Sequence, residues 1–189
     1  MTDRPTDDTT TRGRAAVLVV STSAATEPSL DRTGPGIAAW LRERGFVVEE
    51  PVIVPDGGPI AETVTAALLA DARVVVTTGG TGVTPTDRTP EAVAPLLDLE
   101  LPGVLEEVRR RGLAGAGPTA LLSRGVAGIA STGAFVVTLP GSRGGVADGL
   151  AVIDGLLDHV LAQVHGAGHA PRTTDGAGHA SRTAEGATS

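Results

Sequence analysis

The sequence lacks two residue types on which many active sites depend. It contains no cysteine, which excludes thiolate zinc sites, iron–sulfur clusters, disulfides and a cysteine nucleophile. It also contains no lysine, because all 15 basic residues are arginine, and this excludes a P-loop lysine and lysine Schiff bases. Aromatic residues amount to 2%, so the core of this 41% hydrophobic chain must consist mainly of Val, Leu and Ala.

Hydropathy and charge restrict the partners. No apolar run approaches the roughly 18 residues of a membrane span, and the N-terminus lacks the apolar segment of a secretory signal. We therefore expect a cytoplasmic protein without a membrane partner. The net charge of −7 falls on the central part of the chain, because charges in the two end segments cancel. A negative surface with few aromatic side chains argues against nucleic acid as a partner.

The two ends of the sequence are predicted to be disordered tails around one domain of residues 15–165. Residues 1–14 are polar, and residues 166–189 carry a ten-residue repeat in which "HGAGHAPRTT" is echoed by "DGAGHASRTA". Segments so rich in Gly, Ala, Ser and Thr cannot bury enough apolar surface to offset their ordering entropy. His169 and His179 in this repeat are isolated imidazoles, for which a solvated tail is favoured over a metal site.

Segments typical of strands and helices alternate within the domain. Short β-branched runs predict buried strands, and Pro51 predicts an edge strand or a bulge. Longer stretches with apolar residues at helical spacing predict helices. The expected strands cover 15–21, 46–55, 73–78 and 133–141, and the expected helices cover 31–45, 58–72, a short turn from 89, 102–112 and 144–165. Such alternation predicts an α/β fold with a parallel sheet covered by helices, whose ligands lie at the carboxyl ends of the strands.

One strand is followed directly by a glycine-rich loop, Gly79-Gly80-Thr81-Gly82. The loop fits neither the dinucleotide-binding pattern nor the P-loop pattern. Residues without a Cβ allow backbone N–H groups to converge on an anion. A tight turn after a strand explains the same glycines equally well, so both interpretations stay open here.

Two carboxylates flank this loop in the predicted topology. Asp56 closes the second strand and Asp87 follows the glycine loop, so both can point into one crevice above the sheet. Two carboxylates beside an anion are unfavourable unless a cation lies between them, and Mg²⁺ prefers one or two carboxylates together with phosphate oxygens and water. Either aspartate alone is more often a turn or cap residue. Together they favour a metal–triphosphate site.

Positive charge near this edge comes from arginine. Arg88, Arg124 and Arg143 are candidate phosphate contacts, because guanidinium groups bind phosphate in a bidentate manner. Each of them, taken singly, is more often a surface residue.

Residues 109–111 are interpreted as a solvated helix end without a role in the site, and His159 is interpreted as a structural residue.

Five blocks of the sequence resemble one family when taken in order. They are "DRTGP", "VVVTTGGTGVTPTDRTPEA", "LPGVLEEVRRRGL", "PTALLSRGVAGI" and "VVTLPGSRGGVADGL". This succession resembles the MogA/MoaB family of molybdenum cofactor biosynthesis proteins over residues 15–165. A single GGTG would mean little, whereas five blocks in order with suitable spacing are specific.

The resemblance implies a three-layer sandwich with a mainly parallel central sheet covered by helices on both faces. It implies a molybdopterin adenylyltransferase, which uses Mg²⁺ and ATP to place AMP on the terminal phosphate of molybdopterin and releases pyrophosphate. It also implies a homotrimer and hand-over of the product to a molybdate-insertion protein.

The resemblance also implies the site residues. Asp56 and Asp87 match the two acidic residues required for the reaction and are the expected catalytic and metal-binding groups. The matched substrate-binding positions are Thr78, Gly79, Gly80, Thr81, Gly82, Ser123, Arg124, Gly125, Pro140, Gly141 and Ser142. Two departures stand out: the loop "STSAAT" after the first strand offers only hydroxyls where many relatives carry Asp or Arg, and Arg143 replaces a frequent proline.

Two alternatives to the transferase remain at this point. A MoaB-type paralogue would bind molybdopterin or a related pterin without efficient adenylyl transfer, and a scaffold would have no catalytic role. Retention of both aspartates and of the whole glycine loop favours the enzyme.

Overall fold

The computed structural model describes residues 11–166. The tails predicted at the two ends, with His169 and His179, lie largely or wholly outside these residues. The strands are β1 (Arg14–Val20), β2 (Val47–Val48), β3 (Val52–Val54), β4 (Ala72–Thr78), β5 (Leu97–Glu100), β6 (Ala127–Ala130) and β7 (Phe135–Leu139). The α-helices are α1 (Thr22–Thr26), α2 (Gly34–Glu43), α3 (Ile60–Leu69), α4 (Thr89–Val93), α5 (Pro102–Ala116), α6 (Arg143–Asp154) and α7 (Leu157–Val164), and short 3₁₀ helices cover Pro28–Leu30, Ala94–Leu96 and Gly117–Leu122.

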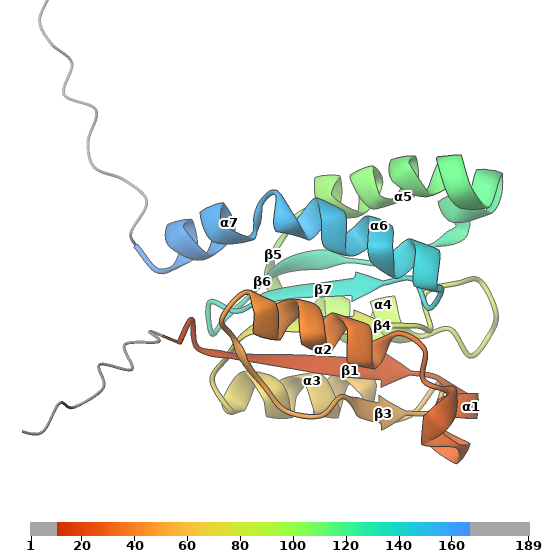
Figure 1. The fold of residues 1–189 in the computed structure, drawn as a ribbon, viewed down its shortest axis with the longest axis horizontal. Coiled ribbons are helices and arrows are strands. Elements are labelled where there is room, and N and C mark those ends of the chain that lie inside the picture. The colour runs from red at the N-terminus through yellow and green to blue at the C-terminus, as the bar shows by residue number, and fades with distance from the viewer. Residues whose placement is uncertain (1–10, 167–189) are drawn as a thin grey trace, which may run out of the picture.

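The strands form one mixed sheet in the order β2-β1-β4-β7-β6-β5, with β3 also paired to β1. Strands β2, β3 and β4 run parallel to β1, and β7 runs parallel to β4. Strands β6 and β5 are antiparallel to their neighbours. The expected mainly parallel sheet is therefore confirmed, with an antiparallel edge beyond β7 (Figure 1).

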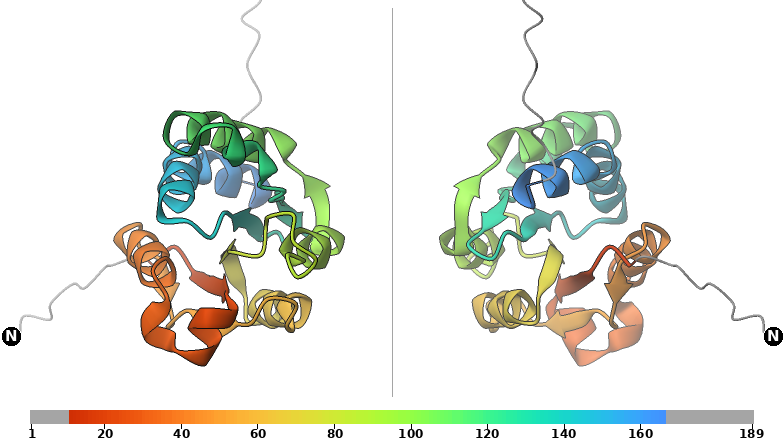
Figure 2. Two further views of the ribbon diagram at one scale, coloured as in Figure 1. Left: turned by 90° about the vertical axis from the view of Figure 1, so that its right-hand side faces the viewer. Right: turned by 90° about the vertical axis from the view of Figure 1, so that its left-hand side faces the viewer.

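Helices cover both faces of the sheet, as expected for a three-layer sandwich. Alternate residues of β1 point to opposite faces, so Val17 and Val19 pack into the core with α2, α5, α6 and α7, and Leu18 and Val20 pack into the core with α3 and α4. Figure 2 shows α3 across the sheet from α6.

The segment predicted as one strand over 46–55 is divided in two. β2 ends at Val48 and β3 begins at Val52, and both pair with β1 at the edge of the sheet. Pro51 has no N–H to donate to a ladder, and it lies in the interruption. The expectation of an edge position or a bulge at Pro51 is confirmed.

The single closing helix predicted over 144–165 is wrong in one respect. The chain forms α6 and α7, interrupted at Gly155 and Leu156. Glycine lowers the stability of a helix interior, and the break still lets Leu157 and Leu161 enter the same core as α6. The apolar periodicity continues through the break, which is why it suggested one helix.

The described ends differ slightly from the expected domain boundaries. Arg14 already belongs to β1, and the backbone N–H of Arg12 donates to the carbonyl of Gly45 at 3.0 Å. At the other end, α7 finishes at Val164. Between residues 11 and 166, no helix combines the length and apolar character that crossing a bilayer requires.

Candidate active site

The glycine loop after β4 begins with a tight turn against the end of β1. Gly79 and Gly80 have φ values of 92° and 60°, which glycine adopts without strain. A Cβ on Gly79 would lie 2.1 Å from the carbonyl oxygen of Val20, and a Cβ on Gly80 would lie 2.4 Å from the hydroxyl of Thr89. The tight-turn interpretation of these glycines therefore holds.

The four carbonyl groups of residues 79–82 all accept hydrogen bonds from the protein. Thr89 donates to the first two, with its hydroxyl at 2.8 Å and its backbone N–H at 3.0 Å. Arg124 donates to the last two, with its backbone N–H at 2.8 Å and its Nε at 2.7 Å. The loop is thus fixed through its carbonyls.

The N–H groups of the same loop behave differently. Among residues 11–166, those of Gly80, Thr81 and Gly82 have no hydrogen-bond acceptor. Gly80 and Thr81 are buried residues, and buried N–H groups without a partner are rare in proteins. Three successive N–H groups without acceptors are able to bind an anion, so the tight turn is compatible with an anion site in the same loop.

Asp87 is fixed within the segment that follows. Its Oδ2 accepts from the backbone N–H of Thr84 at 2.9 Å and from the Thr84 hydroxyl at 2.6 Å. A Cβ on Gly82 would lie 2.9 Å from the same Oδ2, so glycine leaves room for the carboxylate. Asp87 lines a hollow of about 350 Å³ together with Arg88 and Arg124.

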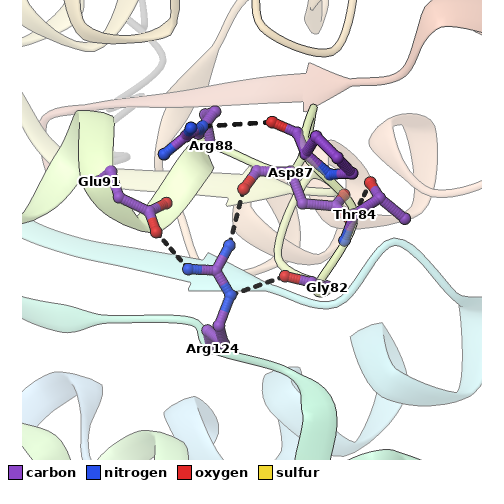
Figure 3. Close-up of polar contacts among 7 residues, drawn as sticks. Gly82, Thr84, Asp87, Arg88, Glu91 and Arg124 are labelled. Carbon is purple, nitrogen blue, oxygen red and sulfur yellow. Dashed lines mark hydrogen bonds and ion pairs between the residues drawn. The ribbon is translucent and has the colours of Figure 1, made fainter.

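Arg124 braces this segment, as Figure 3 shows. Its Nε donates to the Gly82 carbonyl, its Nη2 donates to the Asp87 carbonyl at 2.6 Å, and its Nη1 is paired with Glu91. The hydrogen bond from Arg124 is the largest cause that lowers the pKa of Glu91. The structure therefore places Arg124 at the site, with each guanidinium nitrogen already engaged by the protein.

Asp56 is fixed from a distant part of the chain. Its Oδ2 accepts from the backbone N–H and the hydroxyl of Thr22, at 3.0 and 2.8 Å, and its own N–H donates to that hydroxyl at 3.2 Å. Sequence reasoning missed Thr22. The available signal was the hydroxyl-rich loop "STSAAT", where charged residues were expected.

The two aspartates share an edge of the sheet. Asp56 follows β3 and Asp87 follows β4, and these strands lie on either side of β1. Asp56 does not line the hollow of about 350 Å³ that Asp87 enters. No hydrogen bond of the described residues joins the two directly.

Each aspartate has one oxygen available for a cation. In both aspartates, Oδ2 accepts the hydrogen bonds from threonine. Oδ1 accepts no hydrogen bond from any residue between 11 and 166. Mg²⁺ commonly takes one or two carboxylates and completes its shell with phosphate oxygens and water. That part of the chain contains no group of three acidic or histidine side chains able to form an all-protein cage. The donors thus fit a Mg²⁺ ion carried with a nucleotide.

The loop after β7 lies against the glycine loop. The Thr78 hydroxyl donates to the Pro140 carbonyl at 2.8 Å, and a Cβ on Gly141 would lie 3.2 Å from the Cα of Gly79. Ser142 caps α6 by accepting from the N–H of Gly145 at 3.1 Å. The fold therefore brings residues 140–142 to residues 78–82.

The remaining predicted segment, residues 123–125, joins the same group. The Ser123 and Thr81 hydroxyls lie 3.1 Å apart. Gly125 is buried, and a Cβ there would lie 2.3 Å from the Thr138 carbonyl, so packing against β7 accounts for its missing side chain.

Known proteins are similar to this chain in sequence and fold. Residues 16–159 match the family described as "Probable molybdopterin binding domain". The chain belongs to the MogA/MoaB family of molybdenum cofactor biosynthesis proteins. The resemblance noted in the sequence is confirmed.

Three relatives illustrate the relation of this MogA/MoaB family member to others. It is 37% identical over 156 residues to the molybdenum cofactor biosynthesis bifunctional protein of Synechococcus elongatus, which covers 82% of this chain and 48% of that protein. It is 34% identical over 148 residues to the molybdopterin adenylyltransferase of Pyrococcus furiosus, with 77% and 87% covered. The Mog protein structure from Mycobacterium ulcerans aligns with a TM-score of 0.74 at 44% identity, over 81% of this chain and 97% of that one.

The bifunctional relatives are longer than this chain. It spans about half the length of the proteins from Synechococcus elongatus and Chlorobaculum tepidum that it matches. The similarity to them therefore concerns one part of each.

Proposed function

We propose that this protein is a molybdopterin adenylyltransferase, which transfers AMP from Mg-ATP to the terminal phosphate of molybdopterin and releases pyrophosphate. The observation that carries the proposal is the loop of residues 79–82, whose carbonyls are all bonded within the protein while three N–H groups have no acceptor among residues 11–166. The similarity to the Pyrococcus furiosus enzyme of that name supports it.

The chemistry needs no protein nucleophile. An oxygen of the terminal phosphate attacks the α-phosphorus of ATP, the bond from that phosphorus to the bridging oxygen breaks, and pyrophosphate leaves. A phosphate monoester with a second pKa near 6 is already largely dianionic at neutral pH, so no general base is required. A chain without cysteine or lysine is sufficient for such a reaction.

The residues then act by positioning and by charge. The N–H groups of Gly80, Thr81 and Gly82 bind phosphate oxygens, which holds the reacting groups in line. Oδ1 of Asp56 and Oδ1 of Asp87 would hold the Mg²⁺ ion. When bound, Mg²⁺ neutralises charge on the triphosphate and on the departing pyrophosphate.

The assembly and the next step belong to the same proposal. A homotrimer and transfer of the adenylylated product to a molybdate-insertion protein agree with the resemblance. A pterin-binding paralogue without efficient transfer is the second candidate. The observation in favour of this second candidate is that Asp56 does not line the hollow that contains Asp87.

The test is pyrophosphate release by the purified full chain supplied with molybdopterin, ATP and Mg²⁺ under anaerobic conditions. We expect release that depends on molybdopterin and stops on chelation of Mg²⁺, together with a product that carries AMP by mass spectrometry. Binding of molybdopterin without pyrophosphate release would contradict the transferase and support the paralogue.

A further inference from the structure

Thr89 holds the beginning of the glycine loop. It is the first residue of α4, and it is fully buried. Its hydroxyl donates to the carbonyl of Gly79 at 2.8 Å, and its backbone N–H donates to the carbonyl of Gly80 at 3.0 Å. Within residues 11–166, no side-chain hydrogen bond caps the start of α4. Threonine hydroxyls often cap helices, so the Thr89 hydroxyl is committed to the loop in place of this usual role.

The two hydrogen bonds from Thr89 determine where the next N–H groups point. In a planar trans peptide, the C=O of one residue and the N–H of the following residue point in opposite directions. The Gly79 carbonyl points toward the Thr89 hydroxyl, so the N–H of Gly80 points away from it. The Gly80 carbonyl points toward the Thr89 N–H, so the N–H of Thr81 points away as well. These are two of the three loop N–H groups that have no acceptor in the described part of the chain.

The third N–H group depends on a different residue. The backbone N–H of Arg124 donates to the Thr81 carbonyl at 2.8 Å, which turns the N–H of Gly82 away by the same rule. The Thr89 hydroxyl therefore acts directly on one peptide, the one that joins Gly79 to Gly80. Loss of this hydroxyl should affect the Gly80 N–H most, the Thr81 N–H less and the Gly82 N–H least.

Thr89 is itself held on both sides along the chain, by the contacts of Arg124 that Figure 3 shows. Arg124 donates to the carbonyl of Asp87, which precedes Thr89, and pairs with Glu91, which follows it. A Cβ on Gly80 would lie 2.4 Å from the Thr89 hydroxyl, so this hydroxyl lies directly against the loop. Glycine has wide backbone freedom, so a buried donor in a fixed place is what keeps such a peptide in one orientation.

We infer that Thr89 is a positioning residue of the anion-binding loop: its hydroxyl holds the peptide between Gly79 and Gly80 so that the Gly80 N–H is ready for a phosphate oxygen. Thr89 acts through the loop and does not touch the anion. Donors that are oriented before a charged group arrives need no reorganisation when it binds. The inference rests on the proposed function only for the identity of the anion as a substrate phosphate. It concerns a residue outside the substrate-binding positions that the family resemblance implies.

The first test observes the loop N–H groups themselves. Inorganic phosphate is titrated into the isotope-labelled full chain at constant ionic strength, and the backbone amide signals of Gly80, Thr81 and Gly82 are followed by NMR. Phosphate at up to about 50 mM reveals a Kd as weak as about 10 mM. We expect all three signals to shift in wild type. Thr89→Val removes the hydroxyl, so we expect about tenfold weaker phosphate binding, with the response of Gly80 reduced most.

Thr77→Val is the matched control. Thr77 is also fully buried and lies shortly before Gly79 on β4, and its hydroxyl has no hydrogen-bond partner within the described residues. The same substitution there removes a hydroxyl without removing a hydrogen bond, so the Kd for phosphate should stay within about twofold of wild type. A difference between the two valine variants therefore reports the bond from Thr89 to Gly79.

A second pair of variants serves if Thr89→Val does not fold. Thr89→Ser and Thr89→Ala both lose the methyl group, and only serine keeps the hydroxyl. We expect a Kd for phosphate close to wild type in Thr89→Ser and about tenfold weaker binding in Thr89→Ala. Melting temperatures are measured on the same samples. A purely structural role would lower the melting temperature and leave the Kd for phosphate unchanged.

Several results would overturn the inference. They are a wild type whose three amide signals do not respond to phosphate, wild-type affinity in Thr89→Val, an equal loss in Thr77→Val, or equal affinity in Thr89→Ser and Thr89→Ala.

Pyrophosphate release tests the transferase separately. If wild type binds phosphate at the loop, Thr89→Val binds it more weakly, and wild type releases no pyrophosphate from ATP and molybdopterin, the positioning role stands and the transferase fails. If wild type and Thr89→Val release pyrophosphate with the same kcat and KM, the transferase stands and the positioning role fails.

Discussion

The two aspartates of the candidate site are held by the same pair of bonds, supplied from different distances along the chain. Thr84 lies three residues before Asp87 and donates its N–H and hydroxyl to one carboxylate oxygen. Thr22 donates the same two groups to Asp56 across 34 residues. A local turn thus fixes one carboxylate, and the pairing of β1 with β3 fixes the other.

The surroundings of the two aspartates differ as well. The Asp87 segment is braced by Arg124, which donates to the carbonyls of Gly82 and Asp87. Asp56 has its hydrogen bonds to Thr22 and does not line the hollow that contains Asp87. Two carboxylates that we propose to bind the same metal ion can therefore depend on unequal structural support.

The largest expected effect comes from removing either charge. Asp87→Asn and Asp56→Asn should each lower pyrophosphate release by about 10²- to 10³-fold, because each deletes an anionic oxygen needed for the metal. Asparagine keeps an oxygen for the threonine donors, so the melting temperature should change little. Measurement of kcat over a range of Mg²⁺ concentrations checks this. Wild-type activity in either variant would remove that residue from the metal site.

A smaller effect is expected from replacing Arg124, which donates hydrogen bonds to the segment that contains Asp87. Arg124→Lys replaces a planar guanidinium group, which contacts two carbonyls, by one compact ammonium group. The loop should therefore become more mobile. We expect kcat to fall about tenfold, with ATP binding nearly unchanged, because displaced groups weaken catalysis more than affinity. A rise in KM for ATP at constant kcat would instead indicate direct substrate contact by Arg124.

A still smaller effect is expected from the bond that fixes Asp56. Thr22→Val removes the hydroxyl and keeps the backbone N–H, so one of two hydrogen bonds to the carboxylate remains. A decrease in kcat of about two- to tenfold is expected. Thr22→Ser should restore activity, because serine keeps the hydroxyl. Failure of serine to rescue would show that the methyl group, and hence packing, is what matters at this position.

The smallest effect concerns pH and the Glu91–Arg124 pair. The pKa of Glu91 is lowered from 4.5, first by the hydrogen bond from Arg124. A lowered carboxyl pKa contributes stability above the unfolded-state value and loses it as pH falls through the folded-state value. Because the pair is exposed to solvent, Glu91→Gln should cost at most about 1 kcal/mol near neutral pH.

Denaturant unfolding of wild type and Glu91→Gln at several pH values checks this sign. The difference between them should close as the solution is acidified below 4.5. A difference that grows in acid would contradict the assignment of Arg124 as the cause.

The sequence predicted the parallel half of the fold well and the antiparallel half poorly. Strands β1, β4 and β7 are β-branched runs buried on both faces, and such runs give a strong signal. Strand β6 is only "AGIA" and β5 is the mostly exposed "LDLE", so neither shows a usable periodicity. Helix α1 was missed for the same reason, because five small residues give no amphipathic pattern.

The sequence predicted which segments belong to the candidate site. It did not predict the hydrogen bonds that join these segments. The gathering of residues 78–82, 123–125 and 140–142 agrees with the strand order. The engagement of Arg124 by loop carbonyls could not be seen in the sequence, since a guanidinium beside small residues suits a ligand as well as a backbone oxygen.

The sequence alone determined the strands that form the centre of the sheet, the glycines that permit a tight turn after β4, and the local bond between Thr84 and Asp87. These features depend on neighbours in the chain, so residue type and spacing are enough to specify them. The tertiary structure decided which N–H groups were left without acceptors among residues 11–166, and that Thr22 would reach Asp56. Such contacts join residues far apart in sequence, and they exist only after the sheet has packed between its helices.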